Sequence, residues 1–396
     1  MGDRLAIDGG TPVRATLLPY GRHHIDDADI AAVSAALRSD WLTTGPTVEA
    51  FEEAFAAYCG VKYAVAVNSG TAALHVACHA IGMDARTEAI VPSMTFVSTP
   101  NAVRYCQAHV RITDVDAESL MLTPETAQAS MMPLTRAVIP VDFAGQPANM
   151  DELRRLCIEK KYLMVLDAAH SLGARYKGLP VGQHAHVTAF SLHPVKSMTS
   201  GEGGVAVTND EEIARKMRAF RTHGIASSPR ERAAKGEWYY EMNALGFNYR
   251  IPDILCALGL SQLKKLDGFI ARRREIDARY RAAFKELPGV RMLAQLPDRE
   301  SACHLFPILF DLDLFRVDRA QIFRALRAEG IGVNVHYIPV HLHPYYRRIG
   351  YGPGMCPVAE SAYERIITLP LWPHMTEGDT NDVIAAVHKV VEAYRA

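Results

Sequence analysis

Two residues, an aspartate and a lysine, each follow a short apolar run at the point where a buried β-strand should end. Asp167 comes directly after Tyr162–Leu166, and Lys196 lies in the turn that follows Val187–Leu192. A carboxylate among apolar neighbours is unfavourable without a cationic partner, which the protonated nitrogen of a heteroaromatic ring would supply. A lysine held in such a turn can be partly removed from water, which lowers its pKa and favours a Schiff base with a carbonyl compound. Considered alone, the aspartate is more often a helix cap and the lysine a solvated loop residue.

A candidate anion site and a candidate stacking residue follow two other apolar runs. Asn68-Ser69-Gly70-Thr71 joins a predicted strand to a predicted helix, where the first helical amides and the hydroxyls would form a pocket for a phosphate. The segment is not a Walker loop, because no Gly-Lys-Ser follows, and it is not the dinucleotide-binding glycine pattern. Phe96 follows a further strand, so it could lie over a flat ring at the sheet edge. By themselves, the first segment is an ordinary helix cap and the second a core phenylalanine.

These four features are far stronger together than apart. Each stands at the end of a strand of one predicted sheet. Together they supply an amine, an acid for a ring nitrogen, a phosphate pocket and a stacking face, and pyridoxal phosphate needs all four. The sequence therefore predicts a pyridoxal-phosphate site in which Lys196 and Asp167 are the catalytic residues.

The elements that must position these residues alternate short apolar runs with helical segments between about residues 60 and 210. This pattern is typical of an α/β protein with a mostly parallel sheet covered by helices, in which ligands bind at the carboxyl ends of the strands. The predicted strands are Tyr63–Val67, Ala89–Val91, Arg136–Val141, Tyr162–Leu166, Val187–Leu192 and Gly204–Thr208.

The chain divides into four predicted parts. Residues 1–45 form an N-terminal arm and helix, 46–251 the large domain with the cofactor site, and 252–287 a long connecting helix. Residues 288–396 have strands and helices of their own, which predicts a smaller C-terminal α/β domain. In it we expect strands at His304–Phe310 and Gly332–His336 and helices at Arg319–Ala328 and Thr380–Tyr394.

Composition and charge argue against several classes of protein. The 396 residues carry a formal net charge of -1, which gives no reason to expect a surface for nucleic acid or an anionic membrane. The N-terminal segment lacks the apolar core of a signal peptide, and no stretch reaches the roughly 18 apolar residues of a membrane helix. The seven cysteines are scattered without a Cys-x-x-Cys pair, which predicts free thiols in a reducing cytoplasm.

Longer motifs resemble the DegT/DnrJ/StrS family of sugar aminotransferases, which have the fold-type-I fold of aspartate aminotransferase. The most specific motif is Phe190-Ser-Leu-His-Pro-Val-Lys196 with Gly201-Glu-Gly-Gly204, where Leu192 replaces the commoner phenylalanine. The resemblance extends from Ser39–Pro46 to Leu369–Pro373. It implies a large domain with a mostly parallel seven-stranded sheet covered by helices, and a smaller C-terminal α/β domain.

The resemblance also assigns roles around the cofactor. It makes Lys196 the Schiff-base lysine, Asp167 the partner of the pyridine nitrogen and His170 the neighbour of the phenolic oxygen. Phe96 would stack on the ring. The phosphate would be held by Ser69, Gly70, Thr71 and Ser191.

The segment Gly246-Phe-Asn-Tyr-Arg250 resembles a loop that enters the partner subunit's site in this family. The resemblance therefore implies a homodimer with shared active sites. Asn248 would reach the cofactor phosphate and Arg250 the sugar nucleotide. A lone Asn or Arg in a loop is otherwise a surface residue, so both assignments rest on the resemblance.

A histidine-rich segment indicates the substrate class. Val335–Tyr346 resembles enzymes that aminate C4 of UDP-linked 4-keto-6-deoxy hexosamines on the route to pseudaminic acid, and we expect His336 and Tyr337 to bind substrate. Pro92–Thr99 and Leu120–Pro124 are closer to the enzyme of UDP-4-amino-4-deoxy-L-arabinose synthesis. Both are C4 aminotransferases of UDP-4-keto sugars, with L-glutamate as the donor and 2-oxoglutarate as the second product. The histidine spacing fits no common zinc site, so no metal is predicted.

Three alternatives to this interpretation differ in the residues that they require. Amination at C3, or of a cyclitol ketone, would use the same residues and stays open. A sugar 3-dehydratase of this fold would have a histidine in place of Lys196. A regulator that keeps the fold without catalysis would lose Lys196 or Asp167, and both residues are present.

Overall fold

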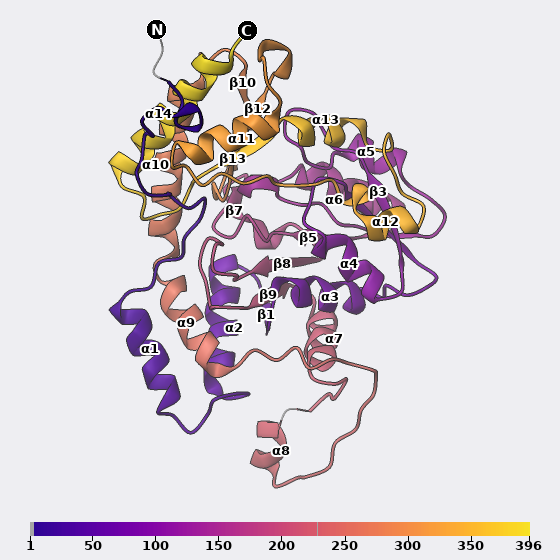
Figure 1. Cartoon of the computed structure of the whole chain (residues 1–396). Helices are drawn as coiled ribbons and strands as arrows, with labels where there is room; N and C mark the ends of the chain where they lie inside the picture. Colours follow the sequence, from indigo (N-terminus) through magenta and orange to yellow (C-terminus); the bar gives the residue numbers. More distant parts are fainter. Residues whose placement is uncertain (1–3, 228) are drawn as a thin grey trace.

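The computed structural model describes residues 4–227 and 229–396, and its centre is a seven-stranded sheet in the order β1-β9-β8-β5-β4-β2-β3 (Figure 1). β9 runs antiparallel to β1 and β8, and the remaining neighbours are parallel. The mostly parallel seven-stranded sheet predicted for the large domain is therefore confirmed. The strands are β1 Tyr63–Val67, β2 Glu88–Pro92, β3 His109–Thr113, β4 Thr135–Val138, β5 Leu163–Asp167, β8 Val187–Ser191 and β9 Gly204–Thr208.

The edge strand β3 is the one strand of this sheet that the sequence pattern did not reveal. Each of the predicted apolar runs forms a strand, with ends shifted by a few residues at most. β3 instead begins with the exposed His109, and its partly exposed Arg111 separates the buried Val110 and Ile112. Because an edge strand is not covered like a central one, it lacks the continuous apolar run by which the other strands were recognised.

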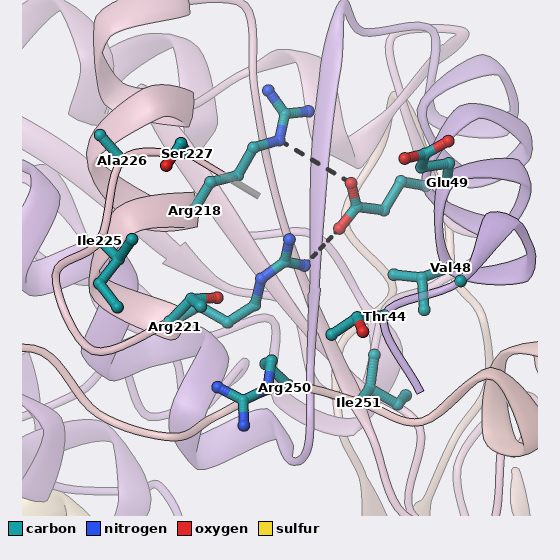
Figure 2. A pocket seen from close by; sticks show the side chains of 13 residues that line it. Thr44, Val48, Glu49, Arg218, Arg221, Ile225, Ala226, Ser227, Arg250 and Ile251 are labelled. Carbon is teal, nitrogen blue, oxygen red and sulfur yellow. Dashed lines mark hydrogen bonds and ion pairs between the residues drawn. The ribbon is translucent and has the colours of Figure 1, made fainter. Parts of the chain in front are cut away.

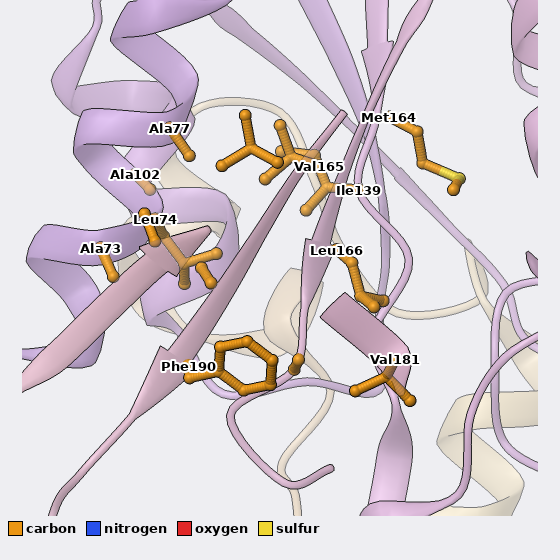
Figure 3. Packing of buried hydrophobic residues seen from close by; sticks show 14 of the residues in the cluster. Ala73, Leu74, Ala77, Ala102, Ile139, Met164, Val165, Leu166, Val181 and Phe190 are labelled. Carbon is orange, nitrogen blue, oxygen red and sulfur yellow. The ribbon is translucent and has the colours of Figure 1, made fainter. Parts of the chain in front are cut away.

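Helix α3 begins directly after β1 and packs on the sheet through a face of small apolar residues. Ala73, Leu74 and Ala77 point toward the strands and belong to the same buried cluster as Phe190 of β8 (Figure 3). This packing places the first turn of α3 beside the end of β8. The helices of the large domain include α2 Pro46–Cys59, α3 Gly70–Ala80, α4 Ser98–Tyr105, α5 Pro124–Ala129, α6 Met150–Lys160 and α7 Glu211–Arg221.

The C-terminal part has a separate apolar core around a three-stranded antiparallel sheet in the order β10-β12-β13. This confirms the predicted smaller α/β domain. The strand predicted at Gly332–His336 is wrong, because only Asn334 pairs there, in an isolated bridge to Thr368. The segment leaves the sheet after this bridge and lines a cavity instead. The elements are β10 Val290–Met292, β12 Phe306–Phe310, β13 Ile366–Leu369, α11 Arg319–Ala328 and α14 Glu377–Tyr394.

The predicted connecting helix over 252–287 is in fact two helices, α9 (Asp253–Leu263) and α10 (Leu266–Phe284). At the break, the amine of Lys265 forms ion pairs with Asp26 at 2.6 Å and Asp29 at 2.8 Å, around the start of α1 (Asp27–Leu37). No Gly or Pro marks this position, so the helical pattern of the sequence continues through it. The interruption coincides with a contact to a distant helix. The predicted domain bounds themselves stay predictions.

Residues 223–227 and 229–250, here called the protruding arm, extend away from the body of the molecule between α7 and α9 (Figure 1). The arm contains the short helix α8 (Pro229–Lys235) and exposes large apolar side chains, among them Trp238 at 84 % and Leu245 at 80 %. An apolar surface of this kind is typical of a protein–protein contact. None of the helices that the structure describes, α8 included, is long and apolar enough to cross a membrane.

Candidate active site

A cavity of about 630 Å³ lies where β5 and β8 end, beside the first turn of α3. All predicted cofactor and substrate residues line this cavity except Asn248 and Arg250. The predicted residues that line it come from strand ends of the large domain and from the segment that follows α11. The predicted residues gathered there are Ser69, Gly70, Thr71, Phe96, Asp167, His170, Ser191, Lys196, His336 and Tyr337.

Lys196 lies in the turn after β8, where its backbone N–H donates to the carbonyl of His193 at 2.9 Å. Its side chain is partly buried in the cavity wall. Burial lowers the pKa of Lys196 to about 8; the carboxylate of Asp167 opposes this effect, and the guanidinium of Arg273 adds to it. An appreciable fraction of the amine is therefore unprotonated near neutral pH, as attack on a carbonyl carbon requires.

Asp167 is the last residue of β5 and is only 4 % exposed. Its Oδ2 accepts a hydrogen bond from the Thr99 hydroxyl at 2.6 Å, and its Oδ1 accepts one from the Ala169 N–H at 3.1 Å. Burial raises the pKa of Asp167, while these two donors and the nearby Lys196 act in the opposite direction. Neutral donors offset the burial of a carboxylate only in part, so the position fits a cation such as a protonated pyridine nitrogen.

The predicted phosphate pocket is built at the first turn of α3. The Ser69 hydroxyl caps the helix by accepting from the Ala72 N–H at 3.1 Å. The amides of Gly70 and Thr71 lie too early in the helix to have an acceptor within it, so they are free to bind an anion. A Cβ on Gly70 would lie 2.7 Å from the Cβ of Ser191, so glycine is what allows the serine to stand so close. The resulting set of amides and hydroxyls fits a phosphate group.

Three imidazoles and a phenol form a neutral wall of the cavity. The Nε2 of His170 lies 2.9 Å from the hydroxyl of Tyr337, and the ring centroids of His170 and His304 are 4.5 Å apart. Burial lowers the pKa of His170, His304 and His336, and the positive charge of Lys196 contributes in each case. For His336 the value falls to about 3. At neutral pH these side chains can donate or accept hydrogen bonds without carrying charge.

Phe96 lies at the cavity with 56 % of its surface exposed. Phe96 is therefore not a buried core residue, although a phenylalanine usually is. Its ring centroid is 6.0 Å from that of Tyr337. An exposed aromatic face at this edge of the sheet is suited to stacking on a flat ring.

Several cavity residues were missed by sequence analysis because they come from distant parts of the chain. Tyr20 precedes the first α-helix and His304 precedes β12, yet both line the cavity with Lys196. No local pattern marks either one as functional. Thr99 does not line the cavity, but its hydroxyl directly contacts Asp167, and its place at the end of the Pro92–Thr99 segment was a sequence signal. Thr95, Glu202 and Asn334 also line the cavity.

Asn248 and Arg250 lie outside the cavity of their own chain. Arg250 lines a separate pocket of about 170 Å³ together with Arg218 and Arg221 (Figure 2). Those two arginines share the carboxylate of Glu52, at 3.8 Å and 2.5 Å, and Arg250 stands apart from this network in Figure 2. The structure thus brings ten of the predicted site residues together and leaves these two elsewhere.

The model of the DegT/DnrJ/EryC1/StrS aminotransferase family matches residues 23–388. The chain belongs to this family. The spore coat polysaccharide biosynthesis protein SpsC of Bacillus subtilis is 39 % identical to this aminotransferase over 382 residues, which cover 96 % of this chain and 98 % of SpsC.

Two solved structures are similar to this aminotransferase over nearly its whole length. Spr1654 of Streptococcus pneumoniae, a putative sugar aminotransferase in its PMP form, has a TM-score of 0.89 and 29 % identity, covering 95 % of this chain and 99 % of its own. Helicobacter pylori PseC, an aminotransferase involved in the biosynthesis of pseudoaminic acid, has a TM-score of 0.88 and 30 % identity, covering 96 % and 100 %. Spr1654 has also been solved in a PLP form.

This protein is therefore a pyridoxal-phosphate-dependent aminotransferase that acts on sugars. The site described above offers groups suited to the carbonyl carbon, the ring nitrogen, the flat ring and the phosphate of this cofactor. When bound, pyridoxal phosphate serves as the electron sink that stabilises negative charge at the carbon next to the transferred amine. The amine of Lys196, the acid of Asp167 and the pocket at the first turn of α3 are the groups that would hold this cofactor.

Proposed function

We propose that this sugar aminotransferase moves an amino group from L-glutamate to C4 of a UDP-linked 4-keto sugar. The products are an amino sugar and 2-oxoglutarate. The observation that supports this most is the composition of the cavity, where Lys196 and Asp167 share one space with His336 and Tyr337. The latter two belong to the segment that resembles C4 aminotransferases of the pseudaminic acid route. The similarity to PseC over the whole chain points in the same direction.

Each side chain has a defined task in the proposed reaction. The Nζ of Lys196 removes a proton from the α-carbon of the donor and, in the second half-reaction, delivers one to the sugar carbon that receives the amine. Asp167 balances the charge of the ring nitrogen, and Ser69 and the first amides of α3 hold the phosphate. His336 and Tyr337 bind sugar hydroxyls without adding charge to the cavity.

A panel of ketosugars tests the substrate assignment. The purified enzyme is incubated with L-glutamate and UDP-linked 4-keto sugars, dTDP-linked 4-keto sugars, 3-keto sugars or a cyclitol ketone, and the products are identified by mass and NMR. We expect amination at C4 of a UDP-linked sugar, with one 2-oxoglutarate formed for each amine. Transfer to C3, or to the cyclitol, would contradict the proposal and support the corresponding alternative. The Lys196→Ala enzyme serves as the blank in every reaction.

We also propose that the enzyme is a homodimer in which Asn248 and Arg250 complete the partner's active site. Both residues lie outside the cavity of their own chain and belong to the protruding arm. The arm exposes Trp238 and Leu245, and α1 exposes Ile30 at 56 %. A two-fold dimer would cover such apolar surface and would carry each arm to the other subunit's site.

Mixing an inactive variant with a strongly impaired one should restore activity if the sites are shared. One variant carries Lys196→Ala, and the other carries Asn248→Ala and Arg250→Ala. The two variants are unfolded and refolded together in equal amounts, so half of the dimers should be mixed. Each mixed dimer then has one site that carries every substitution and one site that carries none. Activity should therefore recover to about a quarter of wild type if the sites act independently. The measurement is the rate of amino-sugar formation.

The same experiment can reject the arrangement. If the arm serves the site of its own chain, every site in a mixed dimer carries a lesion and no activity returns. Native mass spectrometry must show that mixed dimers formed. Each variant refolded alone provides the baseline.

A further inference from the structure

Arg273 of α10 is a buried cation that the chemistry described above does not use. Its side chain is 1 % exposed and stands among the largest fully buried ones. No carboxylate of the described residues lies within ion-pair distance of its guanidinium. Instead, its Nη1 donates to three main-chain carbonyls, those of Cys303 at 3.5 Å, His304 at 3.3 Å and Leu371 at 2.9 Å.

Burying such a residue in a protein core is energetically unfavourable. Burying a charge without a counter-charge is unfavourable, and an apolar side chain of similar size would avoid the penalty. The buried Nε of Arg273 has no partner among the described residues, so the hydrogen bonds compensate only part of this cost. Burial lowers the pKa of Arg273 to about 10, which still leaves the group charged at neutral pH. A permanent charge in this position is therefore expected to have a use.

The carbonyl partners of Arg273 connect it to two walls of the active-site cavity, because one partner lines the cavity and another bonds a residue that does. His304 lines the cavity, and its ring lies against His170. Leu371 accepts from Arg273, and its own N–H donates to the carbonyl of Tyr20 at 3.2 Å. Tyr20 also lines the cavity. One guanidinium thus joins the main chain behind two cavity residues that are far apart in the sequence.

We propose that Arg273 is a positioning residue of the active site, which holds the walls at His304 and Tyr20 and keeps a positive charge behind them that acts on the Lys196 amine. Its planar fork fixes carbonyls in a way that a flexible ammonium group does not. The inference rests on the proposed role of Lys196 in the reaction. Arg273 itself does not line the cavity.

The groups around Lys196 determine what removal of this charge should do. Asp167 favours the protonated amine, while burial and Arg273 favour the neutral one. The nearby His170 and His304 are kept neutral by burial, which lowers the pKa of each. Without the Arg273 charge, less opposes the effect of Asp167, which favours the protonated amine. The pKa of Lys196 should therefore rise. The other titratable groups of the cavity, which the substitutions leave in place, are Tyr20, His193, Glu202, His336 and Tyr337.

Competitive labelling of the cofactor-free chain measures this effect without any activity assay. Trace acetic anhydride is added at a series of pH values, and mass spectrometry follows acetylation of Lys196 against the exposed Lys62 as an internal standard. The wild-type midpoint for Lys196 should lie near pH 8. In Arg273→Met, which keeps similar length without charge, the midpoint should rise by about one pH unit. In Arg273→Lys the new amine is buried and burial lowers its own pKa, so the Lys196 midpoint should lie between those of Arg273→Met and wild type.

The visible absorption of the cofactor-loaded enzyme gives a second pH midpoint, which should shift upward in Arg273→Met as well. Arg273→Gln, a neutral residue that still donates hydrogen bonds, replaces Arg273→Met if the latter does not fold. An unchanged Lys196 midpoint in a folded neutral variant would overturn the inference.

Arg273→Lys also tests the positioning role by itself. It should release the cofactor several-fold faster than wild type, because a flexible ammonium group fixes the carbonyls behind His304 and Tyr20 less well than the guanidinium does. A wild-type release rate would reject that role, even if both neutral variants fail to fold. Borohydride reduction in each variant shows separately whether Lys196 binds the cofactor, so failure of the Lys196 assignment would be recognised as such.

Discussion

Lys196→Ala is expected to lose transamination by roughly three to four orders of magnitude, because the variant has no amine to move the proton at the reacting carbon. The loss should appear in both half-reactions, since the same amine serves each of them. The fold should persist, because the change removes a group whose burial is itself unfavourable, as its lowered pKa shows. Single-turnover formation of 2-oxoglutarate from L-glutamate measures the first half-reaction directly.

A matched control separates this effect from the general consequences of removing a lysine. Lys177→Ala removes an exposed lysine that pairs with Asp151 at 2.6 Å, and it should retain full activity. Borohydride reduction of the wild-type enzyme should attach the cofactor to the peptide that contains Lys196. An adduct on another lysine, or near-normal turnover in Lys196→Ala, would end the assignment.

Asp167→Asn should slow both half-reactions by about a hundredfold or more, because the ring nitrogen loses the anion that stabilises its proton. The two side chains have nearly equal volumes, and the Thr99 hydroxyl can still donate to the remaining oxygen. The variant should therefore fold normally. Stopped-flow absorption with L-glutamate, and with the amino sugar in the reverse direction, gives the two rates.

Asp142→Asn is the matched control for this substitution. Asp142 is another fully buried carboxyl, which accepts from the Ser171 hydroxyl at 2.5 Å and does not line the cavity. Burial raises the pKa of Asp142 to about 7, so a neutral amide changes its charge only in part. The control should lower stability by about 1 kcal/mol and leave the rate of the cofactor-loaded enzyme nearly unchanged. A near-normal rate in Asp167→Asn would show that the ring nitrogen does not depend on this acid.

Much of the cofactor site could be predicted from the sequence because its parts are local patterns at strand ends. An apolar run followed by Asp167, and another followed by a turn and Lys196, need no knowledge of distant contacts. Parallel strands end at one edge of a sheet, so recognising the strands was enough to bring these residues together with Ser69. The cavity that contains all three agrees with that reasoning.

Other features depended on contacts that a local pattern does not show. The helical pattern of 252–287 continues through Lys265, yet the chain breaks there, where the lysine meets Asp26 and Asp29. The apolar residues near Asn334 indicated a strand, although only one residue pairs with the sheet. Whether an apolar segment becomes a strand depends on a partner edge being available, and that is a property of the assembled sheet.

The amino-acid sequence by itself was enough to predict the cofactor, the α/β architecture and the candidate pair Lys196 and Asp167, because periodicity and strand ends can be recognised along the chain. Only the tertiary structure decided which distant residues form the other walls of the cavity. Tyr20 and His304 meet there because the first residues of the chain lie against the C-terminal domain, where Leu371 bonds Tyr20. Nothing in the local sequence shows that Arg273 is buried, because other arginines of the same helix stand beside it. Its role follows from burial and from its carbonyl partners, which folding alone brings together.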